Sequence, residues 1–478
     1  MNQRMRTLAI TLVATVVLSV GGGCKTPTDE SADVSTDQEN LNPNKPNANQ
    51  LITQQRLLGD SDKATSIWEI IDSNDGGFLF RGYYNNRYAI GKLDVTGQES
   101  WVTRSTYRVS DVIQLPALFG DLGNGMLTTG GYDSDFDERD DVGYVSLFNS
   151  AGELVHDLTF ERDSASAWLR AIGISSASDT LAQLVGVGGV LVGGVDYPYL
   201  ATFTVASDGT MAKTEDKVFM DRPNMYFNEL AIDQNGISST CYVRGGEYFE
   251  GTGYGNQLVF RMTEEIGIAW SQVAAGQEGM PSWSYNGKGF ACSSNLLVSA
   301  YDTDMDKEVD PTSGGYWDAG VVARLSTDSS VDWVRTIALS EYTEEFFSCY
   351  VSGGSLYAAG VGSAFQKTTS KEELANALLV RFDLATGDQT ATLTFGDEHY
   401  ASQFNDVIVR GTQAYGVGYT QWELAGGPYR GWFAVIDVSG SQMPAVMAKG
   451  TADASMAVDA TSWDAAEAIH RNGREPRE

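Results

Sequence analysis

Histidine and cysteine are scarce in this chain of 478 residues, which contains three histidines and four cysteines. No G-x-S-x-G or C-x-x-C spacing occurs, so the sequence has no nucleophile elbow, zinc knuckle or dithiol redox centre. His156, His399 and His470 lie far apart, and none accompanies a recognisable nucleophile motif. The sequence therefore names no reaction. Glycosidase chemistry needs only two carboxylates, and the 63 acidic residues supply these without marking a pair.

Basic residues are also few, with 32 Lys and Arg against 63 Asp and Glu and a formal net charge of −31. Nucleic acid is therefore excluded as a partner, because binding it needs a basic surface. Anionic lipid head groups would likewise not attract the folded part. The high acidity by itself implies solubility and no specific ligand.

No apolar run is long enough to cross a bilayer. The longest, Leu8–Val20, is shorter than the roughly 20 residues that a membrane-spanning helix needs. It follows Arg4 and Arg6 and precedes small residues and Cys24, which is typical of an export signal. The segment resembles a bacterial lipoprotein signal, although Gly21 stands where leucine is usual. The resemblance implies that Cys24 carries lipid; plain secretion is the alternative.

The ends of the chain differ in composition from its middle. Residues 1–23 are the predicted signal peptide, and residues 24–50, rich in Asn, Asp, Pro, Ser and Thr, are predicted to be a flexible, lipid-anchored tether. The folded region is expected over 51–449, followed by a loose tail over 450–478. We expect an extracytoplasmic protein, attached through lipid to the bacterial outer membrane or cell surface.

The middle of the chain repeats one unit of four short predicted strands. The offset from Tyr83 to Tyr419 is 336 positions, which gives 56 residues per unit over six intervals. The third strand of the unit is the clearest, and it recurs at 87–97, 142–152, 199–209, 256–263, 319–328, 377–387 and 432–440. Four-stranded units repeated around an axis form a β-propeller. The predicted fold is therefore all-β, a seven-bladed β-propeller of four-stranded antiparallel blades after the signal and tether.

The first unit, D-G-G-F-L-F-R-G-Y-Y-N-N-R-Y-A-I-G-K-L-D-V-T-G-Q-E-S-W (75–101), resembles the seven-bladed β-propeller repeats of bacterial surface proteins. It is also similar to the pyrroloquinoline-quinone-like repeat, whose Asp, Gly and Trp docking residues fall on Asp94, Gly97 and Trp101. The spacing from Asp to Gly is one residue short, and later units lose the tryptophan or the aspartate. The resemblance therefore extends to the fold only, and no quinone cofactor is expected.

Two segments compete to complete the last blade. Residues 55–70 align with 391–408, which would make Arg56–Leu58 an outer strand of that blade. Gln442–Lys449 could occupy the same place. Either pairing would cover a sheet edge, and the sequence does not choose between them.

Two acidic stretches, Y-D-S-D-F-D-E-R-D-D and Y-D-T-D-M-D-K-E-V-D, fall in loops between the second and third strands of two units. Their acids alternate along the chain, so a bend could bring several oxygen ligands to one calcium ion. The alternative is solvated charge on an extended loop. The candidate calcium ligands are Asp133, Asp135, Asp137, Asp141, Asp302, Asp304, Asp306 and Asp310.

Aromatic residues also cluster at the predicted loops. Tyrosine and tryptophan are enriched in binding sites, and they serve equally well as packing between blades. The candidate ligand-face aromatics are Tyr248, Tyr254, Trp317, Trp422 and Trp432.

Cys292 and Cys349 lie 57 positions apart, close to one repeat period, in F-A-C-S-S and F-S-C-Y-V. They are therefore expected at matching places in neighbouring first strands, and they are the predicted disulfide. The alternative is a set of small buried thiols, because neighbouring strands can stand too far apart for a disulfide.

The loops between second and third strands leave an antiparallel blade on the same edge as the connections between blades. One acidic, aromatic face is therefore elaborated on a rigid scaffold. The leading hypothesis is a surface-tethered, non-enzymatic binding or scaffold lipoprotein whose loop face meets a protein or a glycan. The alternatives are an extracytoplasmic carbohydrate-active hydrolase or lyase, and a structural envelope protein.

Overall fold

The structure, a computed structural model, is built almost entirely of β-strands. It describes residues 48–105, 107–132, 142–160, 166–233, 236–243, 257–262, 268–273, 290–291, 297–302, 319–325, 331–337, 344–365, 374–396, 401–421 and 428–440. In these ranges the helical elements are two 3-10 turns, η1 (Asn49–Leu51) and η2 (Gly120–Leu122). None of the helices described is long and apolar enough to cross a membrane.

Five four-stranded antiparallel sheets account for most of the strands. The first holds β2 (Ser66–Asp72), β3 (Phe78–Tyr84), β4 (Arg87–Leu93) and β5 (Glu99–Arg104). Two more hold β14 (Met225–Asp233), β15 (Gly236–Val243), β16 (Gln257–Met262) and β17 (Ile268–Val273), and β18 (Phe290–Ala291), β19 (Leu297–Asp302), β20 (Ala319–Leu325) and β21 (Val331–Ile337). The last two hold β22 (Glu344–Ser352), β23 (Ser355–Phe365), β24 (Leu374–Asp383) and β25 (Gln389–Phe395), and β26 (Ser402–Arg410), β27 (Gln413–Thr420), β28 (Arg430–Asp437) and β1 (Ile52–Leu58).

The sixth sheet has eight strands and divides into two four-stranded units. One unit is β6 (Arg108–Gln114), β7 (Met126–Tyr132), β8 (Val142–Phe148) and β9 (Leu154–Phe160). The other is β10 (Ser166–Ala177), β11 (Leu181–Val192), β12 (Val195–Ala206) and β13 (Met211–Val218). A single parallel pair, Ala167 with Val142, joins them. Within each unit the pairing is antiparallel, as in the other sheets.

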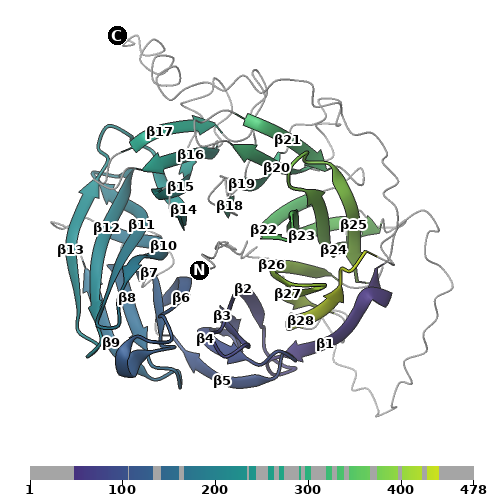
Figure 1. Cartoon of the computed structure of the whole chain (residues 1–478), viewed down its shortest axis with the longest axis horizontal. Coiled ribbons are helices and arrows are strands. Elements are labelled where there is room, and N and C mark those ends of the chain that lie inside the picture. The colour runs from purple at the N-terminus through teal and green to yellow at the C-terminus, as the bar shows by residue number, and fades with distance from the viewer. Residues whose placement is uncertain are drawn as a thin grey trace, which may run out of the picture.

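The sheets stand around a central axis with their first strands innermost (Figure 1). The first strands contact one another in chain order, β2 with β6, β6 with β10, β10 with β14, β14 with β18, β18 with β22 and β22 with β26, and β26 contacts β2. This is a β-propeller, and the prediction of a repeated four-stranded antiparallel unit is confirmed. Each predicted third strand is a strand beside the second strand of its unit. The count of seven blades stays a prediction.

Strand β1, which precedes the first sheet in the chain, completes the last sheet. β1 pairs antiparallel with β28, from Ile52 opposite Ile436 to Leu58 opposite Gly431. The first of the two segments considered from the sequence therefore supplies the outer strand. The other, 442–449, lies outside the described residues.

The turns between third and fourth strands explain why the repeat keeps Asp or Asn and Gly there. The side chain of Asp94 accepts hydrogen bonds from the backbone N–H groups of Thr96 and Gln98, and Gly97 follows at φ +75°, where other residues are strained. The glycine also leaves room for an aromatic ring of the preceding sheet: Phe433 lies against Gly97, and Trp101 against Gly152. The docking expected from the repeat resemblance for Trp101 is thus an aromatic–glycine contact between neighbouring sheets.

Candidate functional site

Most residues of the predicted calcium and anchor sites lie outside the described residues. These are Cys24, Asp133, Asp135, Asp137, Asp141, Asp304, Asp306 and Asp310. Asp302 is described as the last residue of β19, opposite Ala319 at the start of β20. It therefore stands where the second strand of its sheet opens into the loop, as expected. Among the described residues, no group of three or more His, Cys, Asp or Glu is placed to hold a metal ion.

Trp432 is the one candidate ligand-face aromatic that the structure describes, and of the two roles left open for it, ligand binding and packing, the structure shows packing. Trp432 is only 1% exposed. Its ring stacks on Phe404 at a centroid distance of 4.9 Å, and its Nε1 donates to Gln55 of β1 at 3.1 Å. The indole therefore packs the closing strand against its sheet, which is the packing role weighed as the alternative. Tyr248, Tyr254, Trp317 and Trp422 lie outside the described residues.

Cys349 is buried at 1% exposure and is disulfide-bonded. Cys292 lies outside the described residues, so its pairing with Cys349 stays a prediction. It follows β18 directly in the chain, and β18 contacts β22, the strand of Cys349. The placement of these first strands is the one that the sequence argument assumed.

The described residues do bring together a set of buried ionisable groups that the sequence analysis did not single out. It lies on the inner strands at a repeated β-bulge, where the register shifts between Ile67 and Glu69 in β2. The same shift occurs between Val109 and Asp111 in β6, and between Phe404 and Asp406 in β26. A β-bulge re-aims the side chains beside it. Each of these three strands therefore places one carboxylate at an equivalent position around the axis.

Glu69 is paired with an arginine on the neighbouring strand. The Arg81 Nε donates to Glu69 Oε2 at 2.6 Å, and both side chains are at most 2% exposed. Arg81 also donates from one terminal nitrogen to the backbone oxygen of Val109 in the next sheet, at 3.2 Å. The pair thus links the first sheet to β6 as well as bridging β2 and β3.

Asp406 and Asp111 bridge neighbouring inner strands directly. Asp406 Oδ2 accepts from the backbone N–H of Ile70 at 2.9 Å, and Asp111 Oδ2 accepts from Ile172 N–H at 2.7 Å. The other oxygen of each accepts from the next residue of its own strand, and the Ser348 hydroxyl also donates to Asp406. These carboxylates therefore satisfy backbone donors that the bulges release from the sheet ladders.

Burial changes the ionisation of this cluster. The pKa of Glu69 is raised well above its usual value, first by burial and then by the like charges of Asp111 and Asp406, against the opposing effect of Arg81. Burial also raises the pKa of Asp406 to about 7, although hydrogen bonds from Ser348, Ile70 and Val407 favour its charged form. Shifts of this kind occur in catalytic sites and in structural networks alike. Here each carboxylate oxygen of the three residues, except for Glu69 Oε1, accepts a hydrogen bond from the protein itself. This favours the structural role.

One signal in the sequence could have marked this cluster. Glu69, Asp111 and Asp406 are single charges that each precede two apolar residues in predicted first strands, in W-E-I-I, S-D-V-I and N-D-V-I. A charged side chain at that place is either exposed to solvent at a sheet edge or buried and paired with another group. Their recurrence at matching places in the repeat favours the second.

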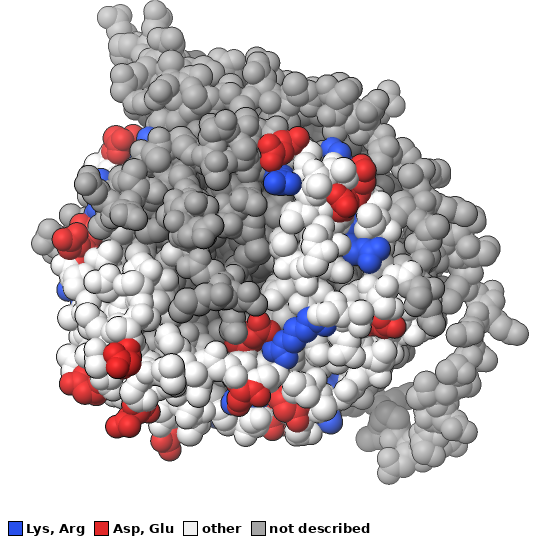
Figure 2. Space-filling view, viewed as in Figure 1, with Lys and Arg blue, Asp and Glu red and all other residues white. Residues whose placement is uncertain are grey.

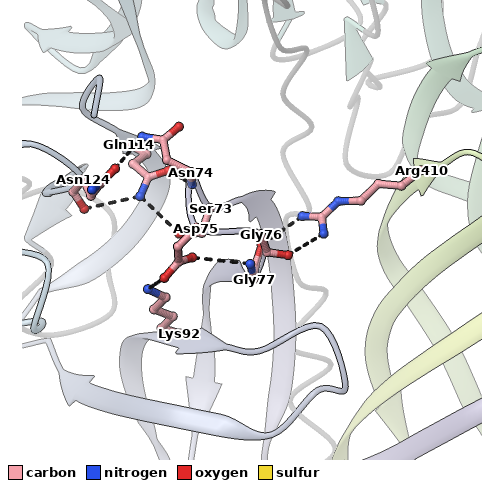
Figure 3. Close-up of polar contacts among 9 residues, drawn as sticks. All are labelled: Ser73, Asn74, Asp75, Gly76, Gly77, Lys92, Gln114, Asn124 and Arg410. Carbon is pink, nitrogen blue, oxygen red and sulfur yellow. Dashed lines mark hydrogen bonds and ion pairs between the residues drawn. The ribbon is translucent and has the colours of Figure 1, made fainter. Parts of the chain in front are cut away.

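A second polar cluster, drawn in Figure 3, links three sheets at the edge where the first strands end. Arg410 of β26 donates to Gly76 O at 2.6 Å and Gly77 O at 2.9 Å, in the turn between β2 and β3. Its guanidinium also lies over the Phe78 ring, 4.2 Å from the centroid. In the same turn, Asn74 donates hydrogen bonds to the next sheet.

The Asn74 backbone N–H donates to Gln114 at 2.8 Å, and its side chain donates to Asn124 at 2.9 Å. Asn124 has a φ of 66°, a conformation that asparagine tolerates better than most residues. Asp75 pairs with Lys92 of β4, and this hydrogen bond lowers the pKa of Asp75 to about 2. The cluster holds sheet edges in place and leaves no group poised for chemistry.

The described part of the surface carries charges of both signs. Figure 2 shows acidic and basic side chains interspersed over the described part of one face, with uncharged residues between them. No extended field of one sign covers the described part of that view. Side-chain hydrogen bonds of the two clusters couple neighbouring sheets to one another.

No protein-family model and no curated protein sequence matches the chain. Similar solved structures include a catalytically inactive virginiamycin B lyase from Staphylococcus aureus with quinupristin, at 9% identity and a TM-score of 0.42, covering 80% of this chain and 99% of that one. An α-L-arabinofuranosidase from Fusarium graminearum has 11% identity and a TM-score of 0.38, covering 81% and 97%. Drosophila plexin A in complex with semaphorin 1b has 8% identity and a TM-score of 0.38, covering 82% and 88%. At these similarities we draw nothing from them about activity, ligand or partner.

Proposed function

We propose that the protein is a surface-tethered, non-enzymatic scaffold that presents one edge of a seven-bladed propeller to a protein or a glycan. The proposal rests mainly on a difference between the two edges of the sheets. We call the edge where second strands end and third strands begin the loop edge, and the opposite one the turn edge.

Connections on the loop edge are long in five units. The strand bounds leave 133–141, 244–256, 303–318, 366–373 and 421–429 between second and third strands. The first and third units have short connections there, 85–86 and 193–194. On the turn edge the first and second strands are joined through short segments such as 178–180, 234–235, 353–354 and 411–412, with 115–125 as the long exception. Long loops on a rigid scaffold usually carry function.

The blade count and the membrane anchor are part of the same proposal. The ring of contacts among the first strands, which returns from β26 to β2, supports seven blades. Residues 1–47 lie outside the described ranges, so lipid attachment at Cys24 and an extracytoplasmic, lipid-anchored location rest on the sequence alone.

The function is tested by probing the full chain on an array of bacterial envelope glycans and against envelope proteins. Replacing 303–318 by a short Gly-Ser linker should weaken binding of the retained ligand by about tenfold or more. Gly353→Asn on the turn edge is the matched control, because asparagine tolerates the φ of 57° there. Conversion of a bound glycan into products would contradict the proposal and favour a hydrolase or lyase.

We further propose that both acidic loops, 133–141 and 303–318, bind calcium. The loops lie outside the described residues, so the proposal rests on their sequence. A ligand that binds only the folded chain stabilises it by about 2.7 kcal/mol at a hundredfold excess over its dissociation constant. Extracellular calcium modules commonly bind at about 0.1 to 1 mM. Millimolar calcium should therefore raise the melting temperature measurably, and magnesium should do so less because it demands octahedral geometry.

The loop variants locate the effect. Asp304→Asn with Asp306→Ser should remove about half of the calcium-dependent shift, and Asp135→Asn with Asp137→Ser the remainder. Asp208→Asn with Asp383→Asn removes two surface carboxylates that cap turns, and it should leave the calcium shift unchanged. If calcium does not change the melting temperature of the unaltered chain, the proposal is wrong and the acidic side chains of the two loops are simply solvated.

A further inference from the structure

The contact between β26 and β2 joins the last sheet of the chain to the first, and we call it the seam. Asp406 accepts from Ile70 N–H at 2.9 Å across it. The Asn405 side chain donates to the Ile67 backbone oxygen at 2.8 Å and to the Ser66 hydroxyl at 3.0 Å. Side chains of β26 therefore provide these hydrogen bonds across the seam, and one of them depends on a carboxylate that titrates.

The seam belongs to a buried group of three carboxylates and one guanidinium. Glu69, Arg81, Asp111 and Asp406 are each at most 3% exposed, and Glu69 feels the charges of the other three. If all four were ionised, the group would carry a net charge of −2. Burying a carboxylate without a counter-charge costs several kcal/mol, so the group gains by retaining a proton.

The hydrogen bonds show where a proton can reside. Among the described residues, Glu69 Oε1 accepts no hydrogen bond, whereas both oxygens of Asp406 accept from donors. A carboxyl proton on Glu69 would therefore displace no existing bond, and one on Asp406 would compete with three donors. Deprotonation of the group leaves two adjacent inner strands carrying uncompensated negative charge across the seam.

We propose that the seam is a proton-linked lock, in which the buried carboxyl groups, Glu69 first, hold protons in the folded chain and the release of these protons as pH rises weakens the joint between β26 and β2. The charged groups that act on Glu69 and Asp406 from neighbouring strands are Arg81 of β3 and Asp111 of β6. β22 supplies the Ser348 hydroxyl. β23, β24, β27 and β28 pack the same region with core side chains, which include the phenols Tyr357 and Tyr415.

The sign follows from comparing the folded and unfolded chains. The Asp406 carboxyl has an ordinary pKa of 3.8 when unfolded and a pKa of about 7 when buried here. The pKa of Glu69 is raised in the same direction. The folded chain therefore binds more protons between about pH 4 and pH 7. Its stability is fully present below that window and falls as pH rises through it.

The test is the pH dependence of unfolding by urea, measured on the full chain from about pH 5 to pH 8 at constant ionic strength. The unfolding constant should rise with pH, by up to about tenfold per pH unit for each proton released. Asp406→Asn should give a shallower slope because the amide does not titrate. The slope of the unfolding constant against pH is compared, and not the stability itself. The asparagine side chain accepts hydrogen bonds through only one of its two terminal atoms, so the variant will be less stable at every pH.

Asp208→Asn is the matched control. Asp208 is an exposed turn carboxylate whose pKa is lowered by hydrogen bonds from Thr210, so it stays ionised throughout the range and its variant should keep the full slope. If Asp406→Asn does not fold, Ser348→Ala serves instead. It removes a donor that favours the charged form of Asp406, so the pKa of Asp406 in the folded chain should rise and the loss of stability should extend to higher pH.

Amide hydrogen exchange places the effect in the molecule. Exchange of Ile70 and Val407 amides should accelerate with pH beyond the intrinsic rate, more than that of amides in β11 and β12. Equal slopes for the unaltered chain and Asp406→Asn, or a stability that rises from pH 5 to pH 8, would overturn the proposal. So would a Ser348→Ala curve that is unshifted or shifted to lower pH.

Discussion

Removal of residues 1–58 is expected to leave a chain that no longer unfolds cooperatively and that aggregates. Those residues include β1, the outer strand on β28. Leu51 and Leu58 are each only 2% exposed, and exposing a buried leucine costs about 1.5 to 3 kcal/mol, so the two side chains alone account for about 3 to 6 kcal/mol. The deletion also leaves β28 with an open edge, which promotes association.

The segment around β1 holds more than its own sheet. Ala48 N–H donates to Thr394 O at 2.9 Å in the preceding sheet. Gln54 and Arg56 both donate to Thr96 O, each at 2.9 Å, in the following sheet. Loss of this segment therefore loosens three sheets at once, which explains why we expect a cooperative effect.

The measurement is urea unfolding followed by circular dichroism, together with size-exclusion chromatography. Removal of residues 1–47 is the matched control, because it leaves β1 in place, and it should preserve the unfolding midpoint. A synthetic peptide of residues 48–58 should restore the truncated chain by adding the missing strand. A chain without residues 1–58 that is monomeric and as stable as the control would show that β1 is dispensable.

The fold was accessible from the sequence because its signals are local and repeated. The third strands, such as 142–148, are apolar runs that end in Asx–Gly turns, and the turn chemistry at Asp94 and Gly97 fixes the register of the next strand. The closing strand was ambiguous because the sequence does not show which of the two segments packs beside the last third strand. The choice depends on contacts with Thr394 and Thr96, which lie about 40 or more positions from β1.

The site was less accessible, because the same residue type serves opposite purposes. Asp406 and the acids of 302–310 are alike in sequence, but a β-bulge turns Asp406 toward the backbone of another sheet. Trp432 resembled the loop aromatics in its sequence neighbours, yet it lies within β28, where its ring stacks on Phe404. Burial is decided by which segments pack together, and a repeat pattern predicts this only where every unit carries the same residue.

Replacing Arg81 by methionine should lower the free energy of unfolding by about 3 to 5 kcal/mol once Glu69 is ionised, the usual cost of leaving one member of a buried ion pair alone. Arg81 donates to Glu69 at 2.6 Å and to Val109 O at 3.2 Å. Its loss also removes the guanidinium from above the Trp68 ring. Part of the penalty can be relieved by protonation of Glu69, so the loss should be larger at pH 8 than at pH 5.

The paired replacement separates the uncompensated charge from the lost packing. Arg81→Met combined with Glu69→Leu removes both charges, and it should recover much of the stability because apolar side chains of similar size often substitute for a buried pair. Lys92→Met is the surface control in the same sheet: Lys92 is 19% and its partner Asp75 54% exposed, so its loss should cost at most about 1 kcal/mol. The measurement is urea unfolding of the four proteins at two pH values. If Arg81→Met is no worse than Lys92→Met, or if the double variant is as unstable as the single one, Glu69 is not the charge that Arg81 neutralises.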